Sequence, residues 1–296
     1  MQVGWIMYAI TGITGNIGSQ LADILLANHR SVRAVLRDAA KAPAWEQRGC
    51  EIAIADIGDA AALTSAFAGA EAVFVLVPPL FDPSRGFPEA RAIAESLKSA
   101  LQAARPEKLV YLSTIGAQAA ENNLLSQHTL IENTLRELTL PITCLRPGWF
   151  LENASWDVAP ARTNGVIPSF LQPLDKPVPM VATEDIAATA AALLQETWEG
   201  HRVVELEGPA RVTPNQIAGA FADLLGRPVT METVPRDTWE SLFRSQGMKN
   251  PEPRMRMLDG FNEGWIEFEG GEAGARKGTV TLKTVLKSLI EREAGN

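Results

Sequence analysis

Residues 9–18 read Ala9-Ile10-Thr11-Gly12-Ile13-Thr14-Gly15-Asn16-Ile17-Gly18, and they join a predicted strand to a predicted helix. Gly12 permits a tight turn out of the strand, and Gly15 lets the backbone approach a pyrophosphate. Gly18 lets the helix lie close to the sheet, and the free N–H groups of its first turn then face the phosphates. A tight turn without a ligand is the alternative, but the flanking strand and helix favour a dinucleotide site. The expected contacts are Thr11, Gly12, Thr14, Gly15, Asn16, Ile17 and Gly18.

Short apolar runs alternate with segments of helical spacing through the first half of the chain. The run at residues 72–77 is apolar on both faces, as in parallel strands covered by helices on both sides. This alternation predicts an α/β fold with a Rossmann-type, doubly wound parallel sheet. Strands are expected at residues 6–10, 31–37, 50–56, 72–77, 108–114, 142–146 and 202–206. Helices are expected at residues 17–28, 60–68, 88–104, 127–138 and 184–195.

The rhythm changes past about Trp149, where Pro and Gly become frequent and indicate loops. Later helices, at residues 215–225 and 236–246, indicate a smaller C-terminal α/β lobe, followed by a last helix at 282–291. The stretch 260–278 carries six Gly and four Glu, which is typical of an exposed loop. We therefore expect a dinucleotide-binding domain over residues 1–155, to which residues 184–208 return, and a substrate-side lobe made of residues 156–183 and 209–296.

Composition restricts the class of protein. The chain has 296 residues, 46% of them hydrophobic, and a net charge of −8. Such a chain has enough apolar surface to fold, and its acidity argues against binding nucleic acid. No run approaches the roughly 18 apolar residues of a membrane helix, and no Cys or His pair has the spacing of metal ligands. Two cysteines make no disulfide framework, so we expect a cytoplasmic protein without a metal; a homo-oligomer is left open.

The end of the second strand indicates which dinucleotide binds. NAD sites place an acidic residue about 20 residues past the glycines, whereas Arg37 stands 19 residues past Gly18 here. A guanidinium at this point would bind a ribose 2′-phosphate, and Arg33 and Lys41 are expected to add positive charge nearby. Asp38 is the complicating neighbour, and a solvated Arg37 without a ligand is the alternative. The pattern favours NADP(H).

Several motifs resemble one known family. The glycine spacing within Thr-Gly-x-Thr-Gly is similar to that of the short-chain dehydrogenase/reductase superfamily. Residues 32–38, 145–153 and 184–187 further resemble its atypical NmrA-like branch, from about Met7 onward; Met1–Ile6 would be an extension or an alternative start. The resemblance implies the strand order 3-2-1-4-5-6-7. It also implies contacts of the adenine with Asp56 and Ile57, and of the nicotinamide with Val77 and Pro78.

One expected feature of the superfamily is missing. Its typical reductases use a Ser with a Tyr and a Lys one helical turn apart, which protonate the substrate oxygen. Tyr8 and Tyr111 are the only tyrosines, and both fall inside predicted strands. The family position of the lysine falls near His128. Ser113 and His128 remain as candidate catalytic residues; for His128, a packing role without chemistry is the equally open alternative.

The missing pair favours some acceptors over others. Hydride transfer to a ketone creates an alkoxide that needs a strong acid, whereas transfer to a quinone creates an anion with a pKa near about 10. We therefore expect an NADPH-dependent oxidoreductase that acts on a quinone-like or other conjugated small-molecule acceptor, as NmrA-like quinone and azo-dye reductases do. Phe81, Trp149 and Phe150 are expected to stack on the acceptor, with core packing as the alternative for each. The rival hypothesis is a non-catalytic NADP(H)-binding redox sensor, as other NmrA-like proteins are.

Overall fold

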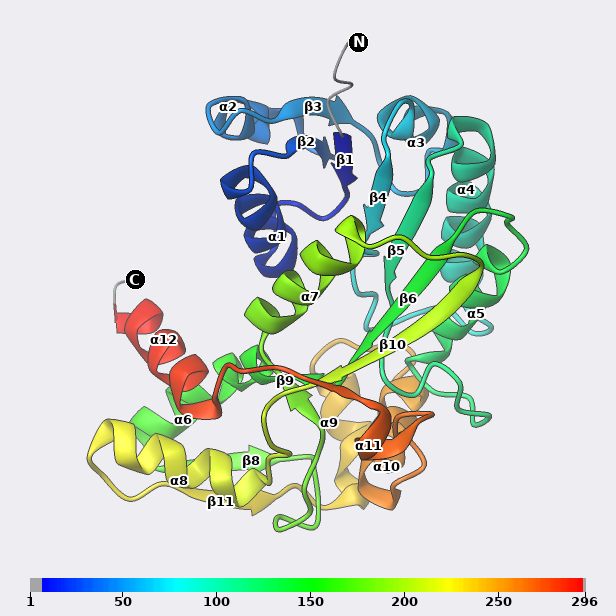
Figure 1. Ribbon diagram of the computed structural model, residues 1–296. Helices are drawn as coiled ribbons and strands as arrows, with labels where there is room; N and C mark the ends of the chain where they lie inside the picture. Colours follow the sequence, from blue (N-terminus) through cyan, green and yellow to red (C-terminus); the bar gives the residue numbers. More distant parts are fainter. Residues whose placement is uncertain (1–6, 295–296) are drawn as a thin grey trace.

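A computed structural model describes residues 7–294, so the Met1–Ile6 extension and the expected strand start at Ile6 lie outside the described residues. Figure 1 shows a parallel sheet in the upper half of the molecule and a smaller lobe below it. The sheet has the order β3-β2-β1-β4-β5-β6-β10-β12, with parallel pairing between neighbours. Its strands are β1 (Met7–Ile10), β2 (Ser31–Leu36), β3 (Glu51–Ile54), β4 (Ala72–Val75), β5 (Lys108–Leu112), β6 (Ile142–Pro147), β10 (His201–Glu207) and β12 (Arg276–Lys277).

The Rossmann-type arrangement is confirmed, and the expected seven-strand order is present from β3 to β10. An eighth strand, β12, extends the far edge. Helices cover both faces of this sheet, which is why its central strands are apolar on both sides. One face carries α1 (Asn16–Ala27) and α7 (Thr183–Gln195), which contact each other; the other carries α3 (Ala60–Phe67), α4 (Pro88–Ala104) and α5 (Ser126–Leu135).

The two faces divide the side chains of β5 by the period of two that a strand imposes. Val110 and Leu112 belong to the core cluster under α1 and α7, whereas Leu109 and Tyr111 belong to the cluster under α4 and α5. All four are buried. The direction of Tyr111 is important for the site, because α5 carries His128.

The lobe has a third hydrophobic core, around the fully buried Phe221, Trp239 and Phe243. Its two-stranded sheets pair β8 with β11 and β7 with β9. Helix α8 begins at Pro214 behind a capping box of Thr213 and Gln216. The short elements are η1 (Ala39–Lys41), α2 (Ala42–Glu46), β7 (Trp149–Phe150), η2 (Leu151–Asp157), α6 (Val158–Thr163), β8 (Val166–Ser169), β9 (Met180–Val181), β11 (Thr230–Thr233), η3 (Arg236–Thr238), α9 (Trp239–Ser245) and α11 (Gly271–Gly274). The longer helices are α8 (Pro214–Leu225), α10 (Glu252–Glu263) and α12 (Leu282–Ala294).

The prediction of an exposed loop at residues 260–278 is wrong. Helix α10 continues to Glu263, and β12 joins the main sheet through Leu206 and Glu207. Ile266 and Phe268 are each 3% exposed and belong to the core of the lobe. Glycines near these hydrophobic residues allow close packing: a Cβ at Gly260 would lie 2.6 Å from Ile266 Cδ1. The expected domain boundary near residue 155 stays a prediction.

Among the described helices, none is both long enough and apolar enough to span a bilayer.

Candidate active site

The glycine turn has the geometry that a bound diphosphate requires. Gly12 has a φ of +66°, a conformation that favours glycine, and a Cβ at Gly18 would lie only 2.3 Å from the carbonyl oxygen of Gly12. Gly15 precedes α1 and supplies no side-chain cap to its first turn. Thr14, Gly15 and Asn16 are exposed. Amides of Asn16, Ile17 and Gly18 are therefore available to hold phosphate oxygens, so the turn fits a dinucleotide.

Thr11 is buried and its side chain binds the protein, unlike the exposed residues of the glycine turn. Its hydroxyl accepts a hydrogen bond from the amide of Leu76 at 2.9 Å and donates one to the carbonyl of Leu76 at 3.1 Å. Thr11 therefore ties the turn to the loop after β4, where Val77 and Pro78 begin the wall of a cavity.

Arg37 follows β2 at the carboxyl edge of the sheet and is exposed. Neighbouring Asp38 forms no ion pair with Arg37; its carboxylate caps η1 and accepts from the amide of Ala40 at 3.0 Å. The expectation that Arg33 adds charge here is wrong. Arg33 lies four residues earlier, donates to Glu51 at 2.8 Å and to the carbonyl oxygen of Ala66 at 2.8 Å, and so belongs to the opposite end of the strand.

Strand β3 runs parallel to β2 and ends at the same edge of the sheet. Asp56 and Ile57 follow β3, and the carboxylate of Asp56 accepts from the amide of Gly58 at 2.9 Å. Asp56 is exposed and Ile57 partly so. Carboxyl ends of parallel strands are where ligands bind in such sheets. Arg37, Asp56 and Ile57 therefore lie on the side where the glycine turn opens.

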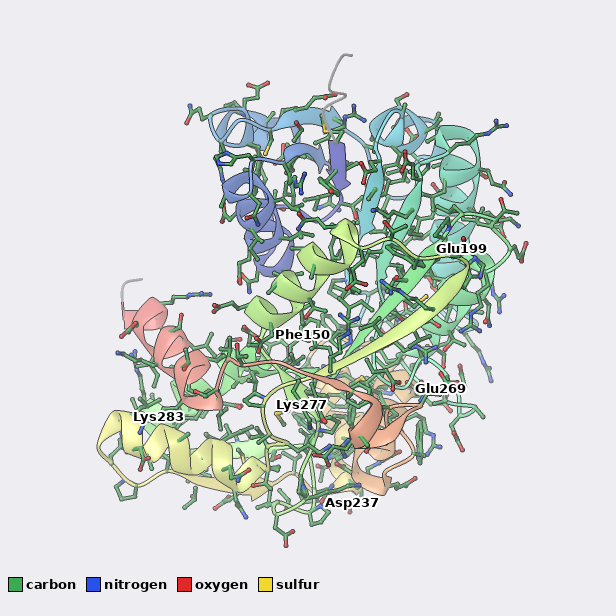
Figure 2. All side chains as sticks on the ribbon, viewed as in Figure 1. Phe150, Glu199, Asp237, Glu269, Lys277 and Lys283 are labelled. Carbon is green, nitrogen blue, oxygen red and sulfur yellow. The ribbon has the colours of Figure 1, made fainter. Side chains whose placement is uncertain are left out.

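A cavity of about 500 Å³ continues from this edge into the lobe. It has the size of a small-molecule site, and its wall is mainly apolar. Trp149 packs edge-on against Phe261, with ring centroids 5.2 Å apart. Phe150, labelled in Figure 2, lies between the sheet and the lobe. The aromatic and polar lining residues are Phe81, Trp149, Phe150, Trp156, Phe170, Phe261, Glu89, Thr114, Gln127, His128, Asn153, Asp157, Ser169 and Arg254.

The three expected substrate contacts, Phe81, Trp149 and Phe150, all line this cavity. Phe81 is 49% exposed and Trp156 is 66% exposed, so they lie at its rim, whereas Trp149 and Phe150 are partly buried. Leu80, Phe81 and Trp156 are exposed large apolar side chains that line the same cavity, and a gathered apolar patch of this kind indicates a place where a ligand enters.

His128 lines the cavity, and its hydrogen-bond partner on β5, Tyr111, was not expected. Nδ1 of His128 lies 2.7 Å from the hydroxyl of Tyr111, which is fully buried. Burial holds the pKa of Tyr111 well above its usual value and lowers the pKa of His128 to about 4. The imidazole is therefore neutral near pH 7. Since the buried phenol needs an acceptor for its proton, it donates to Nδ1, and the proton of the imidazole resides on Nε2.

Ser113 does not reach the cavity. Its hydroxyl donates to Oε1 of Glu132 at 2.5 Å, while Arg146 donates to both oxygens of the same carboxylate at 2.9 and 2.6 Å. Glu132 and Arg146 are each 1% exposed. The cluster anchors α5 to β5 and β6, one helical turn from His128. Ser113 therefore orients the helix that carries His128 and touches no cavity wall itself.

Asp157, at the end of η2, also lines the cavity and was absent from the expected site. Burial in apolar surroundings raises its pKa to about 7. The carboxyl makes no hydrogen bond or ion pair with residues 7–294. It can therefore hold a proton at neutral pH, which an exposed aspartate does not do.

The contact of Tyr111 with α5 could have been recognised from the sequence. Side chains alternate along β5, so residues 111 and 113 face α5 whereas residues 110 and 112 face the other side of the sheet. The two contacts repeat in register: residue 111 with 128, and residue 113 with 132. Two residues along a strand and four along a helix cover similar distances. Asp157 had no comparable signal, because its proton affinity depends on what packs around it.

The turn, the strand edge and the cavity define a dinucleotide-binding protein with an adjoining small-molecule pocket. The family model described as the NmrA-like family matches residues 7–266, and the chain belongs to this family. It is 28% identical over 244 residues to quinone oxidoreductase 2 of Escherichia coli, covering 82% of each chain. It is 27% identical over 260 residues to an NAD(P)H azoreductase of Xenophilus azovorans, covering 87% of this chain and 85% of that one.

Among solved structures, the fold is similar to that of the NADPH-dependent quinone oxidoreductase QOR2 of Escherichia coli in complex with NADPH. The TM-score is 0.79 at 26% identity, and the match covers 98% of this chain and 100% of that one. The expected family is confirmed, and the relatives named here are reductases.

Proposed function

We propose that this protein is an NADPH-dependent oxidoreductase that delivers a hydride to a quinone-like or other conjugated acceptor. The observation that carries the proposal is the cavity: it begins at Val77 and Pro78, where a nicotinamide is expected, and has aromatic walls but no Tyr–Lys pair. Relatives that reduce quinones and azo compounds support the same class of acceptor.

The residues of the chain suit this dinucleotide. Arg37 would bind the 2′-phosphate, amides of the glycine turn would hold the diphosphate, and Asp56 and Ile57 would flank the adenine. Bound in this way, NADPH supplies the hydride. Thr11 contributes by fixing the turn against the loop of Val77 and Pro78 rather than by contact.

The cavity stabilises a weakly basic anion without a phenolic acid. His128 presents an Nε2 proton that can hydrogen-bond an acceptor oxygen, and Tyr111 keeps the ring in that tautomer. Asp157 holds a proton near neutral pH that can pass to the reduced acceptor. A hydroquinone has a pKa of about 10, so these groups suffice to stabilise and protonate its anion. An alkoxide is far more basic, so plain ketones should be poor substrates.

The alternative of a redox sensor has no observation in its favour. An aromatic cavity of this volume beside the dinucleotide turn suits a small molecule, and the named relatives are enzymes. Two buried free cysteines, Cys50 and Cys144, support a reducing, cytoplasmic location. A homo-oligomer stays open and is measured directly by sedimentation.

The test combines the purified protein with NADPH and a panel of 1,4-naphthoquinone, an azo dye, an enone and a plain ketone. Loss of the reduced-nicotinamide absorbance with the quinone, and little with the ketone, is expected. Tight NADPH binding without turnover of any acceptor would overturn the proposal and favour the sensor.

A pair of histidine variants tests the role of the imidazole. His128→Phe should lower kcat with the quinone by about tenfold or more, because a hydrogen bond to the developing anion is lost. His201→Phe is the matched control: His201 is exposed at the amino end of β10, and its Nε2 contacts the carbonyl of Leu138 at 3.0 Å. Its kcat should match that of the wild type, and an equal fall in both variants would contradict the assignment.

A further inference from the structure

One positive charge lies on an otherwise apolar wall. Of the residues that line the cavity, Arg254 alone carries a guanidinium or ammonium group. It belongs to the first turn of α10, which Figure 1 shows in the lobe, below the carboxyl ends of the main strands. The motif around it, Pro253-Arg254-Met255-Arg256-Met257, alternates basic and apolar residues, and the dinucleotide and acceptor assignments leave it without a use.

Protein contacts hold Arg254 but do not neutralise it. Its guanidinium carbon lies 4.4 Å from the ring centroid of Phe243, which is fully buried, and Nη1 lies 3.7 Å from the sulfur of Met248. No carboxylate of residues 7–294 forms an ion pair with it. Burial lowers the pKa of Arg254, and no nearby acid opposes this effect.

Two neighbouring arginines differ from Arg254 in having a carboxylate partner. Arg256 lies two residues further along α10, reaches the carboxylate of Asp259 at 3.5 Å and stacks on Trp265. Arg236 binds the same carboxylate at 2.6 and 2.8 Å. Both have a counter-ion, and neither lines the cavity. Arg254 therefore faces the acceptor space with a fork of donors that no carboxylate of residues 7–294 binds and of which the protein uses only Nη1, toward the sulfur of Met248.

The carboxyls of the cavity do not compensate for this charge. Glu89 accepts from the amide of Ser84 at 3.2 Å, near the loop after β4. Burial alone raises the pKa of Asp157, and no basic group contributes to this shift. A cation in apolar surroundings without a partner costs free energy, and an anionic ligand removes that cost when it binds.

On the basis of the proposed function, we propose that Arg254 binds an acidic substituent of the acceptor, such as a sulfonate, carboxylate or phosphate. The aromatic walls hold the ring system, and the guanidinium selects acceptors with an anionic group at one end. Charge-assisted hydrogen bonds to planar or tetrahedral oxyanions are the interaction for which an arginine is best shaped.

Equilibrium binding to the NADP⁺-loaded protein tests this without turnover. The probes are naphthalene-2-sulfonate and 2-naphthol, which have the same ring system with and without a strong acid. For Arg254→Met, the ratio of the sulfonate to the naphthol dissociation constant should rise by about 10- to 100-fold, as loss of a charge-assisted hydrogen bond predicts. Arg254→Lys, which keeps the charge without the fork, should show a smaller rise.

The matched control is Arg256→Met, which removes the same charge from the same helix outside the cavity and should leave the ratio within about twofold of the wild type. An unchanged ratio in Arg254→Met, or the same rise in Arg256→Met, would overturn the proposal and leave Arg254 a packing residue. If Arg254→Met does not fold, two results together would overturn the proposal. One is that Arg254→Lys has the same ratio of sulfonate to naphthol dissociation constants as the wild type, and the other is that the wild type binds both probes equally tightly.

A kinetic arm separates this inference from the proposed function. The KM for 1,2-naphthoquinone-4-sulfonate should be lower than the KM for 1,2-naphthoquinone in the wild type, and Arg254→Met should reverse that order. Absence of turnover with both quinones would defeat the proposed function, while the binding ratios would still decide whether Arg254 recognises an acid.

Discussion

Replacing Asp157 by asparagine measures how strongly the cavity disfavours charge. Burial raises the pKa of Asp157 from 3.8 to about 7, so the folded protein holds this proton more tightly than the unfolded chain does. The resulting stabilisation is complete below about pH 4 and is lost as the pH rises through 7. The rise in pKa corresponds to roughly 4 kcal/mol. This figure is an upper limit, because water that enters the cavity would screen the ionised carboxyl.

The measurement is the free energy of unfolding in urea, followed by circular dichroism, at about pH 5 and about pH 8. Asparagine has no charge to bury, so Asp157→Asn should gain stability relative to the wild type as the pH rises, by about 2 kcal/mol or more over this interval. Asp175→Asn is the control, because Asp175 is exposed, and its effect should stay within about 0.5 kcal/mol at both pH values. A difference between Asp157→Asn and the wild type that does not change with pH would refute the reasoning.

Three further predictions test the dinucleotide site, the imidazole and its support. Arg37→Asp should raise the Kd for NADPH by about 100-fold or more and that for NADH much less, measured by nucleotide fluorescence; equal losses would defeat the phosphate assignment. Tyr111→Phe should lower kcat with a quinone by about tenfold, because Nδ1 of His128 loses its donor; an unchanged kcat would show that the tautomer is unimportant. Glu132→Gln should lower the free energy of unfolding by about 3 kcal/mol, because Arg146 keeps its buried charge, whereas the exposed Glu137→Gln should cost about 1 kcal/mol or less in the same urea titration.

The core of the dinucleotide fold could be derived before any coordinates. A tight turn at Gly12, close packing at Gly18 and the period of apolar residues are local properties, and each concerns residues close together in the chain. They predicted the strands of the main sheet, the helices between them and the position of Arg37 at a strand end, whereas the order from β3 to β10 was implied by the resemblance to the NmrA-like family. For the glycine turn, the strands and the helices, the geometry of a few consecutive residues restricted the local structure to one choice.

The chemistry of the cavity depended on contacts between distant segments. Ser113 was expected to act on the substrate, yet its hydroxyl is bound to Glu132, and Tyr111 was set aside, yet it determines the tautomer of His128. The glycine-rich stretch 260–278 contributes a strand and several buried hydrophobic side chains, because packing and not local propensity orders it. The proton affinity of Asp157 and the free charge of Arg254 result from what surrounds each group in three dimensions, and the order of residues along the chain does not specify those surroundings.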